Sequence, residues 1–286
     1  MINIIIDNQD IYSEYGVTFA KNGFSGLLGI PAFKQLEITD WPDEDGIEVD
    51  LSSPLLGPHT FQLSFVYVDP EKAMAFYEFI MGAETHVICV NALGVEMTVR
   101  CLNSGKLNCK LKAIGELSLT FVRDEVVLTQ PSFPSTSKVS QRGYYLDSVD
   151  LSSYGIWVLQ GSDESLKKPA AMKENIIINS KSAAGQTSMG YSHEEEGEIV
   201  PDVHIKSKDV TLNLLINAPS DKFIAGYSRF FYDLTRPALR TFTTPFGGPS
   251  NCYYKSSSVR ILEILNGASP RIWCEFSVVL CFVDGK

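Results

Sequence analysis

Two pairs of aspartates are the residues of this 286-residue sequence whose spacing could support chemistry. Asp7 and Asp10 are separated by two residues, and Asp147 and Asp150 repeat that spacing. Two nearby carboxylates could bind a cation or act together in acid and base catalysis. They could also accept hydrogen bonds from backbone N–H groups where a first strand ends in a turn. We favour turn and capping roles, because a catalytic pair normally needs only one copy.

Other residues that could do chemistry form no recognisable site. An acidic run could hold a divalent ion, but such runs are typical of solvated loop tips: Glu194, Glu195 and Glu196. The four histidines lack the H-x-x-x-H or H-x-H spacing of metal ligands: His59, His86, His193 and His204. No phosphate-binding glycine motif follows a strand, and no G-x-S-x-G elbow occurs. We therefore expect no catalytic residue, no metal and no cofactor, and the protein is not expected to be an enzyme.

Six cysteines occur without any C-x-x-C pair: Cys89, Cys101, Cys109, Cys252, Cys274 and Cys281. Most of them lie among residues with a strand-like pattern. We therefore expect reduced, partly buried thiols and no disulfide framework.

The composition, 44% apolar and 20% charged, is that of an ordinary soluble globular protein. No apolar run of about 18 residues or more occurs, and no signal peptide is recognisable at the start, so we expect a cytoplasmic product without a membrane span. The formal net charge of −10 argues against a protein that binds nucleic acid by neutralising phosphates. Acidic walls would instead let DNA pass without sticking.

The aspartate pairs belong to a pattern that occurs twice in the chain. Residues 7–19 read DNQDIYSEYGVTF, and residues 147–158 read DSVDLSSYGIWV. Further matches follow in the same order: 31–36 with 169–176, 43–49 with 194–200, 61–80 with 210–231, and 116–124 with 275–284. Tandem copies of one domain are typical of parts that repeat around an axis.

This duplication predicts two domains joined by a short linker. Residues 129–138 contain two prolines and several Ser and Thr residues between apolar strands, which is linker chemistry. We therefore place domain one at 1–128 and domain two at 139–286. Each copy has about 130 residues, enough to bury its own core.

Alternating apolar residues predict antiparallel, half-buried strands in both copies. Phe61, Leu63, Phe65 and Tyr67 share one face of a strand, and the corresponding residues of copy two are Val210, Leu212, Leu214 and Ile216. The closing strands repeat the pattern at 117–121 and 276–282. The predicted class is mainly β, with two tandem sandwich or barrel modules.

One helix interrupts the strand pattern at the same place in each copy. Asp69 and Pro70 form an N-cap and a first helical proline, which predicts a helix over 70–81. In copy two an aromatic stripe at helical spacing predicts a helix over 220–232. We expect each stripe to pack in the core and not to bind a cofactor.

A long polar stretch occurs in both copies, at 38–50 and 180–202. It could be a solvated loop, or a hairpin that leaves its own domain and lies on a neighbour. Its presence in both copies and the alternation after each acidic turn favour the second interpretation, because open sheet edges need cover. The predicted interface residues are Trp41, Asp43, Glu44, Asp45, Ile47, Val49, Glu194, Glu195, Glu196 and Ile199.

The order of these elements resembles the tail-tube fold of long-tailed bacteriophages, used in tube, distal tail and baseplate hub proteins. The first copy is most similar to the N-terminal domain of distal tail proteins, through DIYSEYGVTF at 10–19, PAFKQLE at 31–37 and DGIEVDLSSP at 45–54. The resemblance covers essentially the whole chain, since copy two follows the same plan. The second half of the chain differs from that of many distal tail proteins, which carry a galectin-like domain in this position. This difference puts receptor binding by this chain in doubt.

The resemblance implies a virion tail component, made in a bacterial host, that lines a DNA channel without binding DNA specifically. Its partners would be further copies of itself and other tail or baseplate proteins. A two-module chain could close a ring as a trimer with pseudo-six-fold symmetry, or six chains could stack two layers. The alternative is a tandem β-sandwich binding protein that recognises sugars or surface proteins through Trp41, Trp157, Tyr253 and Tyr254.

Overall fold

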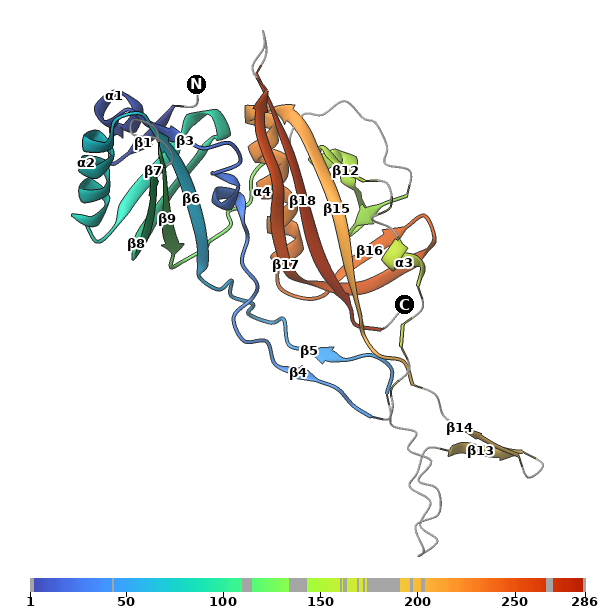
Figure 1. Ribbon diagram of the computed structural model, residues 1–286. Coiled ribbons are helices and arrows are strands. Elements are labelled where there is room, and N and C mark those ends of the chain that lie inside the picture. The colour runs from blue at the N-terminus through green and yellow to red at the C-terminus, as the bar shows by residue number, and fades with distance from the viewer. Residues whose placement is uncertain are drawn as a thin grey trace, which may run out of the picture.

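A computed structural model describes most of the chain (Figure 1). The described residues are 3–42, 44–109, 115–133, 143–159, 161, 164–168, 170, 171, 173, 191–195, 198–201, 204–265 and 270–284. We call residues 3–128 module 1 and residues 143–284 module 2. Residues 134–138 of the predicted linker lie outside the described part.

Module 1 is built on a seven-stranded antiparallel sheet with the order β2-β1-β7-β8-β9-β6-β3. Its strands are β1 (Ile4–Ile6), β2 (Gln9–Asp10), β3 (Val17–Phe19), β6 (His59–Tyr67), β7 (His86–Val90), β8 (Val95–Cys109) and β9 (Gly115–Arg123). A separate short pair, β4 (Ile38–Thr39) and β5 (Glu48–Val49), lies in the loop between β3 and β6.

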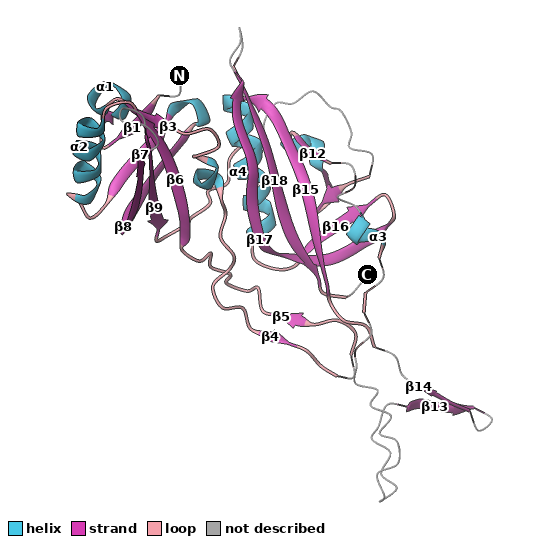
Figure 2. Cartoon of the chain, in the orientation of Figure 1, coloured by secondary structure: helices cyan, strands magenta, loops and turns pink. Residues whose placement is uncertain are grey.

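Module 2 repeats this sheet strand for strand, in the order β11-β10-β16-β17-β18-β15-β12 (Figure 2). Its strands are β10 (Tyr145–Leu146), β11 (Val149–Asp150), β12 (Ile156–Val158), β15 (Lys208–Pro219), β16 (Arg240–Thr244), β17 (Gly247–Leu265) and β18 (Arg271–Phe282). The hairpin β13 (Tyr191–Glu195) and β14 (Glu198–Pro201) forms a separate pair. The mainly β class predicted from the alternation is confirmed.

One long helix packs on each sheet. These helices are α2 (Pro70–Met81) and α4 (Ser220–Thr235). Asp69 caps α2 by accepting hydrogen bonds from the N–H groups of Glu71 and Lys72 at 2.9 and 3.3 Å. The predicted helix of copy one therefore begins and ends where its cap and spacing indicate, whereas α4 continues three residues past 232.

Short helical turns fill the connections. They are α1 (Ile11–Tyr15), η1 (Ser25–Leu28), η2 (Asn91–Leu93), η3 (Leu151–Tyr154) and α3 (Glu164–Lys167). The sequence pattern predicts none of these turns, because each is too short to show helical periodicity.

The apolar face of each central strand is buried as predicted. In β6 the side chains of Phe61, Leu63, Phe65 and Tyr67 are at most 5% exposed. The aromatic stripe of α4 is also core: Phe223, Tyr227, Phe230 and Phe231 are all buried. These rings fill the space between helix and sheet, which supports the structural interpretation of the stripe.

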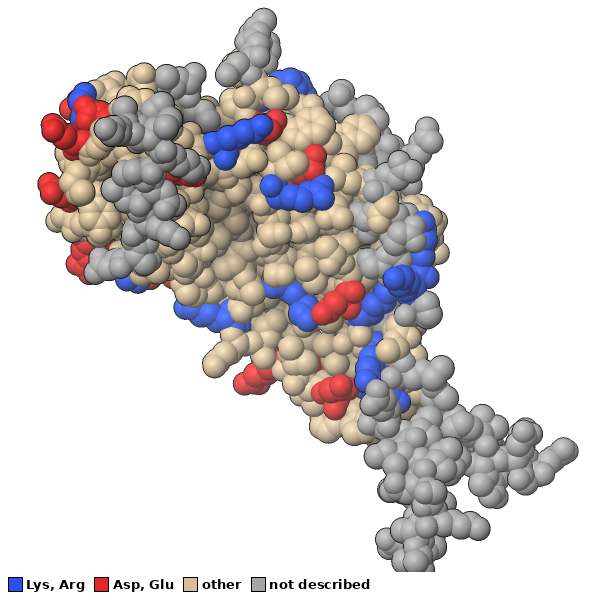
Figure 3. Space-filling view, viewed as in Figure 1, with Lys and Arg blue, Asp and Glu red and all other residues tan. Residues whose placement is uncertain are grey.

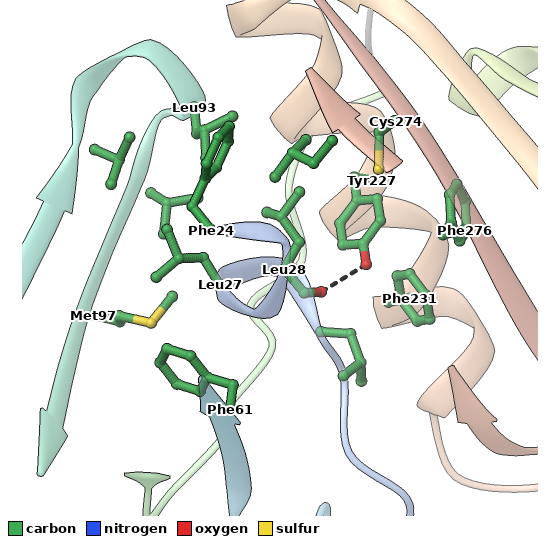
Figure 4. Close-up of a cluster of buried hydrophobic side chains, with 14 of the residues drawn as sticks. Phe24, Leu27, Leu28, Phe61, Leu93, Met97, Tyr227, Phe231, Cys274 and Phe276 are labelled. Carbon is green, nitrogen blue, oxygen red and sulfur yellow. Dashed lines mark hydrogen bonds between the residues drawn. The ribbon is translucent and has the colours of Figure 1, made fainter. Parts of the chain in front are cut away.

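A single hydrophobic core continues from one module into the other (Figure 4). Leu28 of η1 lies beside α4, and the Tyr227 hydroxyl donates a hydrogen bond to the carbonyl of Leu28 at 2.6 Å. Burial raises the pKa of Tyr227 well above its ordinary value, so the hydroxyl keeps the proton that it donates. Residues of each module thus contribute to the core of the other. The duplicated sequence does not predict this shared core.

Candidate assembly surfaces

The paired aspartates of module 1 hold its first turn together. Asp10 caps α1 by accepting hydrogen bonds from the N–H groups of Tyr12 and Ser13. Asp7 accepts from the Val87 N–H at 2.8 Å and lies 2.6 Å from Nδ1 of the buried His86. This supports capping and turn formation, not a cation site.

Module 2 repeats the arrangement with one change. Asp150 caps η3 through the Ser152 N–H, and Asp147 accepts from the Thr241 N–H at 2.9 Å. Arg240 takes the place of His86 and donates to Asp147 at 2.9 Å. Both pairs therefore pin the first strand to its neighbour, and no group of three metal-ligating side chains occurs within the described residues.

The described cysteines are free thiols: Cys89, Cys101, Cys252, Cys274 and Cys281. Burial raises the pKa of Cys101 to about 11 and also raises the pKa values of Cys252 and Cys274. Buried, protonated thiols are poor nucleophiles, so these side chains act as core residues. Within the part of the chain that the structure describes, no helix is both long and apolar enough to cross a membrane.

The connection between β3 and β6 leaves module 1 and lies on module 2 (Figure 1). We call residues 31–58 the crossing loop. Its Ile47 N–H donates to the Val283 carbonyl at 2.9 Å, and its Gly46 N–H donates to the Ile205 carbonyl at 2.7 Å. The Leu51 carbonyl accepts from the Ala238 N–H at 2.9 Å. The neighbour that this loop reaches is therefore the second half of the same chain.

Several predicted interface residues take part in this contact. Asp45 accepts from the Ile205 N–H at 2.8 Å, and Ile47 and Val49 pack against a small apolar cluster of module 2. Glu44 is exposed, and its N–H contacts the Trp41 carbonyl within the loop. Trp41 is 47% exposed and donates from its indole nitrogen to Glu48 at 3.1 Å.

The remaining predicted residues belong to other segments. Asp43 and Glu196 lie outside the described residues. Glu194, Glu195 and Ile199 lie on the β13–β14 hairpin, where Glu194 pairs with Ile199 and Glu195 with Glu198. Their role in assembly remains a prediction.

Sequence reasoning missed the residues of module 2 that receive the crossing loop. The buried Lys173 ammonium lies 2.6 Å from Asp40 and donates to the Trp41 carbonyl at 2.5 Å. Leu51 joins an apolar cluster with Tyr253, Cys281 and Val283. Lys173 lies in the duplicated segment PAAMKENI, but no spacing rule connects it with residue 40.

Gly46 controls how closely the crossing loop approaches module 2. Its φ of +70° is in the left-handed region, and a Cβ built there would collide with the Val283 carbonyl. We expect Gly46→Ala to lower the free energy of unfolding by about 3 kcal/mol, from backbone strain and loss of the Ile47 hydrogen bond. Urea denaturation would measure this, with Gly57→Ala, at the base of the loop, as the milder control because its φ is not positive. A loss equal to that of the control would contradict the tight contact.

Each sheet presents a face opposite its long helix, and we call these two surfaces the polar faces. In module 1 the polar face contains Gln62, Ser64, Ser118 and Thr120, and in module 2 it contains Thr211, Asn213, Ser258 and Ser277. Serine hydroxyls bridge neighbouring strands in both: Ser64 with Ser118 at 3.0 Å, and Ser258 with Ser277 at 2.8 Å.

The polar faces of the two modules meet along an open groove of about 390 Å³. Gln62 and Ser64 line it from module 1, and Ser257, Ser258 and Val259 line it from module 2. Few charged side chains surround this groove (Figure 3). Two pairs of opposite charges lie on the module 2 side of this surface, Lys255 with Asp209 at 2.7 Å and Arg260 with Glu275 at 2.5 Å. The surface therefore combines polar side chains with ion pairs.

The aromatic residues suggested for ligand recognition do not lie together. Trp41 and Trp157 are 47% and 42% exposed, but they belong to different elements. Tyr253 and Tyr254 are buried, and the Tyr254 hydroxyl donates to the Ile30 carbonyl at 2.6 Å. Both tyrosines are therefore core residues and not exposed recognition residues, because β17 turns them toward apolar clusters.

Comparison with solved structures gives a structural similarity. No protein-family model matches the chain, and no curated protein matches it. Among solved structures, the chain is similar to the Dit (gp 19.1) protein of phage SPP1, described as a paradigm of the hub adsorption apparatus in phages that infect Gram-positive bacteria. The superposition has a TM-score of 0.33 at 8% sequence identity, and it covers 99% of this chain and 98% of the phage protein.

Proposed function

We propose that this chain is a structural, non-enzymatic subunit of a phage-type tail. In this proposal it forms a ring of distal tail or baseplate hub type, which joins the tail tube to the tail tip. The chain would be made in the host cytoplasm and assembled into the virion tail. The resemblance of both halves to the tail-tube fold supports this assignment.

The observation that carries the proposal is the docking of two like modules side by side within one chain. Module 1 contributes η1 and the crossing loop, and module 2 contributes α4 and the surface around Val283. A ring needs one such contact repeated around an axis, and this chain already contains one copy of it. Three chains would then supply six modules.

In this proposal the polar faces form the wall of a DNA channel. Both border the same groove, so one side of the chain presents hydroxyl and amide groups with paired charges. DNA is retained when cationic side chains neutralise its phosphates and release the counterions bound to them. A surface without excess positive charge offers no such gain, so it does not retain DNA. DNA would pass along it without specific binding.

Self-association tests the proposal. Sedimentation velocity from micromolar to millimolar concentration should show trimers or hexamers, and negative-stain images should show annular particles. Deleting residues 183–197, which include β13, should weaken the assembly. A strict monomer at millimolar concentration, with no effect of the deletion, would contradict the proposal. Glycan-array binding that is lost in Trp41→Ala would favour the binding-protein alternative.

A further inference from the structure

A stripe of side chains on α4 forms the contact with module 1. Its residues follow one another at about one helical turn: Ser220, Ile224 and Tyr227. Ser220 donates from its hydroxyl to the Ala92 carbonyl at 2.5 Å, and Tyr227 donates to the Leu28 carbonyl. Ile224 and Tyr227 line the narrow space beside Gly94 and η1. Module 1 therefore covers one flank of α4.

Helix α2 has the same position in module 1 as α4 has in module 2. The strand before each helix pairs with the matching edge strand, Tyr67 opposite Val17 and Ile216 opposite Ile156. Both helices then begin three or four residues later, at Pro70 and Ser220. Counting from these first residues, the positions that match Ile224 and Tyr227 are Met74 and Tyr77.

The matching stripe on α2 is apolar but open. Met74 is 48% exposed, whereas its counterpart Ile224 is half-buried; Tyr77 is half-buried, whereas its counterpart Tyr227 is 3% exposed. In Figure 1, α2 lies on the side of module 1 that is remote from module 2. Exposed apolar side chains gathered on one helix flank are typical of contact surfaces.

Module 2 carries a counterpart of the surface that covers α4. Counted from the matched residues Val17 and Ile156, Leu27 of η1 corresponds to Leu166 of α3. A side chain on the following long strand ties each of these turns to the sheet. His59 lies 2.8 Å from the Gly26 carbonyl, and Lys208 donates to the Leu166 carbonyl at 3.0 Å.

The second part of this counterpart is the turn between β16 and β17. It takes the place of η2 and presents Phe246, which is 52% exposed with the Lys167 ammonium 4.7 Å from its ring centroid. Helix α3 lies on the side of module 2 that is remote from module 1 (Figure 1). The chain thus has an open helix stripe at one end and an exposed apolar turn at the other.

We propose that α2 of one chain binds the α3 and Phe246 surface of a second copy, by the same kind of contact that α4 makes with module 1. This inference rests on the proposed ring function and names its intermolecular interface. Contacts of this kind are head-to-tail, so they use two different surfaces of each chain. The residues expected at the centre are Met74 and Tyr77 on one chain, and Leu166 and Phe246 on its neighbour.

Two charge substitutions test the two surfaces separately. Met74→Glu and Phe246→Glu should each weaken self-association of the full chain by at least about tenfold, because each puts a carboxylate into an apolar contact. Lys72→Glu, on the opposite side of α2, is the control and should associate like the wild type. Thermal melts of the monomers would verify that the variants are folded.

Mixing the two variants tests the head-to-tail geometry. Each variant keeps one intact surface, so an equimolar mixture should form a one-to-one pair, detected by native mass spectrometry. Formation of no pair would overturn the proposed geometry. Association of both single variants at wild-type strength would overturn this interface but leave the ring proposal standing. A wild type that stays monomeric at millimolar concentration would overturn both.

Discussion

Replacing Asp147 with alanine is expected to lower the free energy of unfolding by about 3 kcal/mol. Asp147 accepts hydrogen bonds at 2.9 Å from Arg236, Arg240 and the Thr241 N–H. The Arg240 side chain is only 10% exposed, so it would lose its carboxylate partner in a largely dry environment. Urea denaturation followed by tryptophan fluorescence would measure the loss.

Asp147→Asn is the matched control for this prediction. Asparagine suits the positive φ of 47° at this position and keeps an oxygen that accepts from the Thr241 N–H. It should therefore cost less than alanine, by the value of one hydrogen bond between neutral groups, ~1 kcal/mol. A loss of less than about 1 kcal/mol of unfolding free energy in Asp147→Ala would contradict the prediction. It would mean that the carbonyls of Pro237 and Ala238 satisfy the Arg240 guanidinium without the carboxylate.

Asp233→Ala is expected to destabilise the protein by a similar amount, about 3 kcal/mol. This carboxylate is 4% exposed and accepts from the Tyr154 hydroxyl at 2.9 Å and from Arg229 at 2.8 Å. Burial, and then the nearby Asp233 charge, raise the pKa of Tyr154 well above its ordinary value, so the hydroxyl remains a donor. Removing the Asp233 carboxylate deprives the Tyr154 hydroxyl and the Arg229 guanidinium of this acceptor in the interior of module 2.

The same carboxylate has a second effect through Arg229. That guanidinium also donates to the Pro131 carbonyl at 3.1 Å and lies 4.2 Å from the ring centroid of Phe133. A double-mutant cycle with Tyr154→Phe separates the two parts of the network. A coupling energy near zero would show that Asp233 acts mainly through Arg229.

The features predictable from the sequence are those that repeat with a period. Alternation in Phe61–Tyr67 places one face of β6 in the core, and Asp69 with Pro70 marks the first residue of α2. The duplicated Asp-x-x-Asp motif also indicates its own role, because short acidic side chains at a turn usually bind local N–H groups. Each of these features depends on neighbours in the sequence.

The destination of the crossing loop depends on distant residues and could not be predicted. Its hydrogen bonds join backbone groups of Gly46 and Ile47 to Ile205 and Val283, which any residue type could make. The spacing between Asp40 and Lys173 follows no period. The alternation in 47–49 indicated a covered segment, but it could not say which surface covers it.

The crossing loop also limits how this protein can evolve by recombination. The repeat in the sequence suggests that genes could exchange either half at the linker. Yet a crossover there would leave residues 31–58 facing a foreign Lys173, Ile205 and Val283, which hold the native loop in place. Successful chimaeras should therefore inherit the loop together with the surface that receives it, so the heritable unit is the pair of modules.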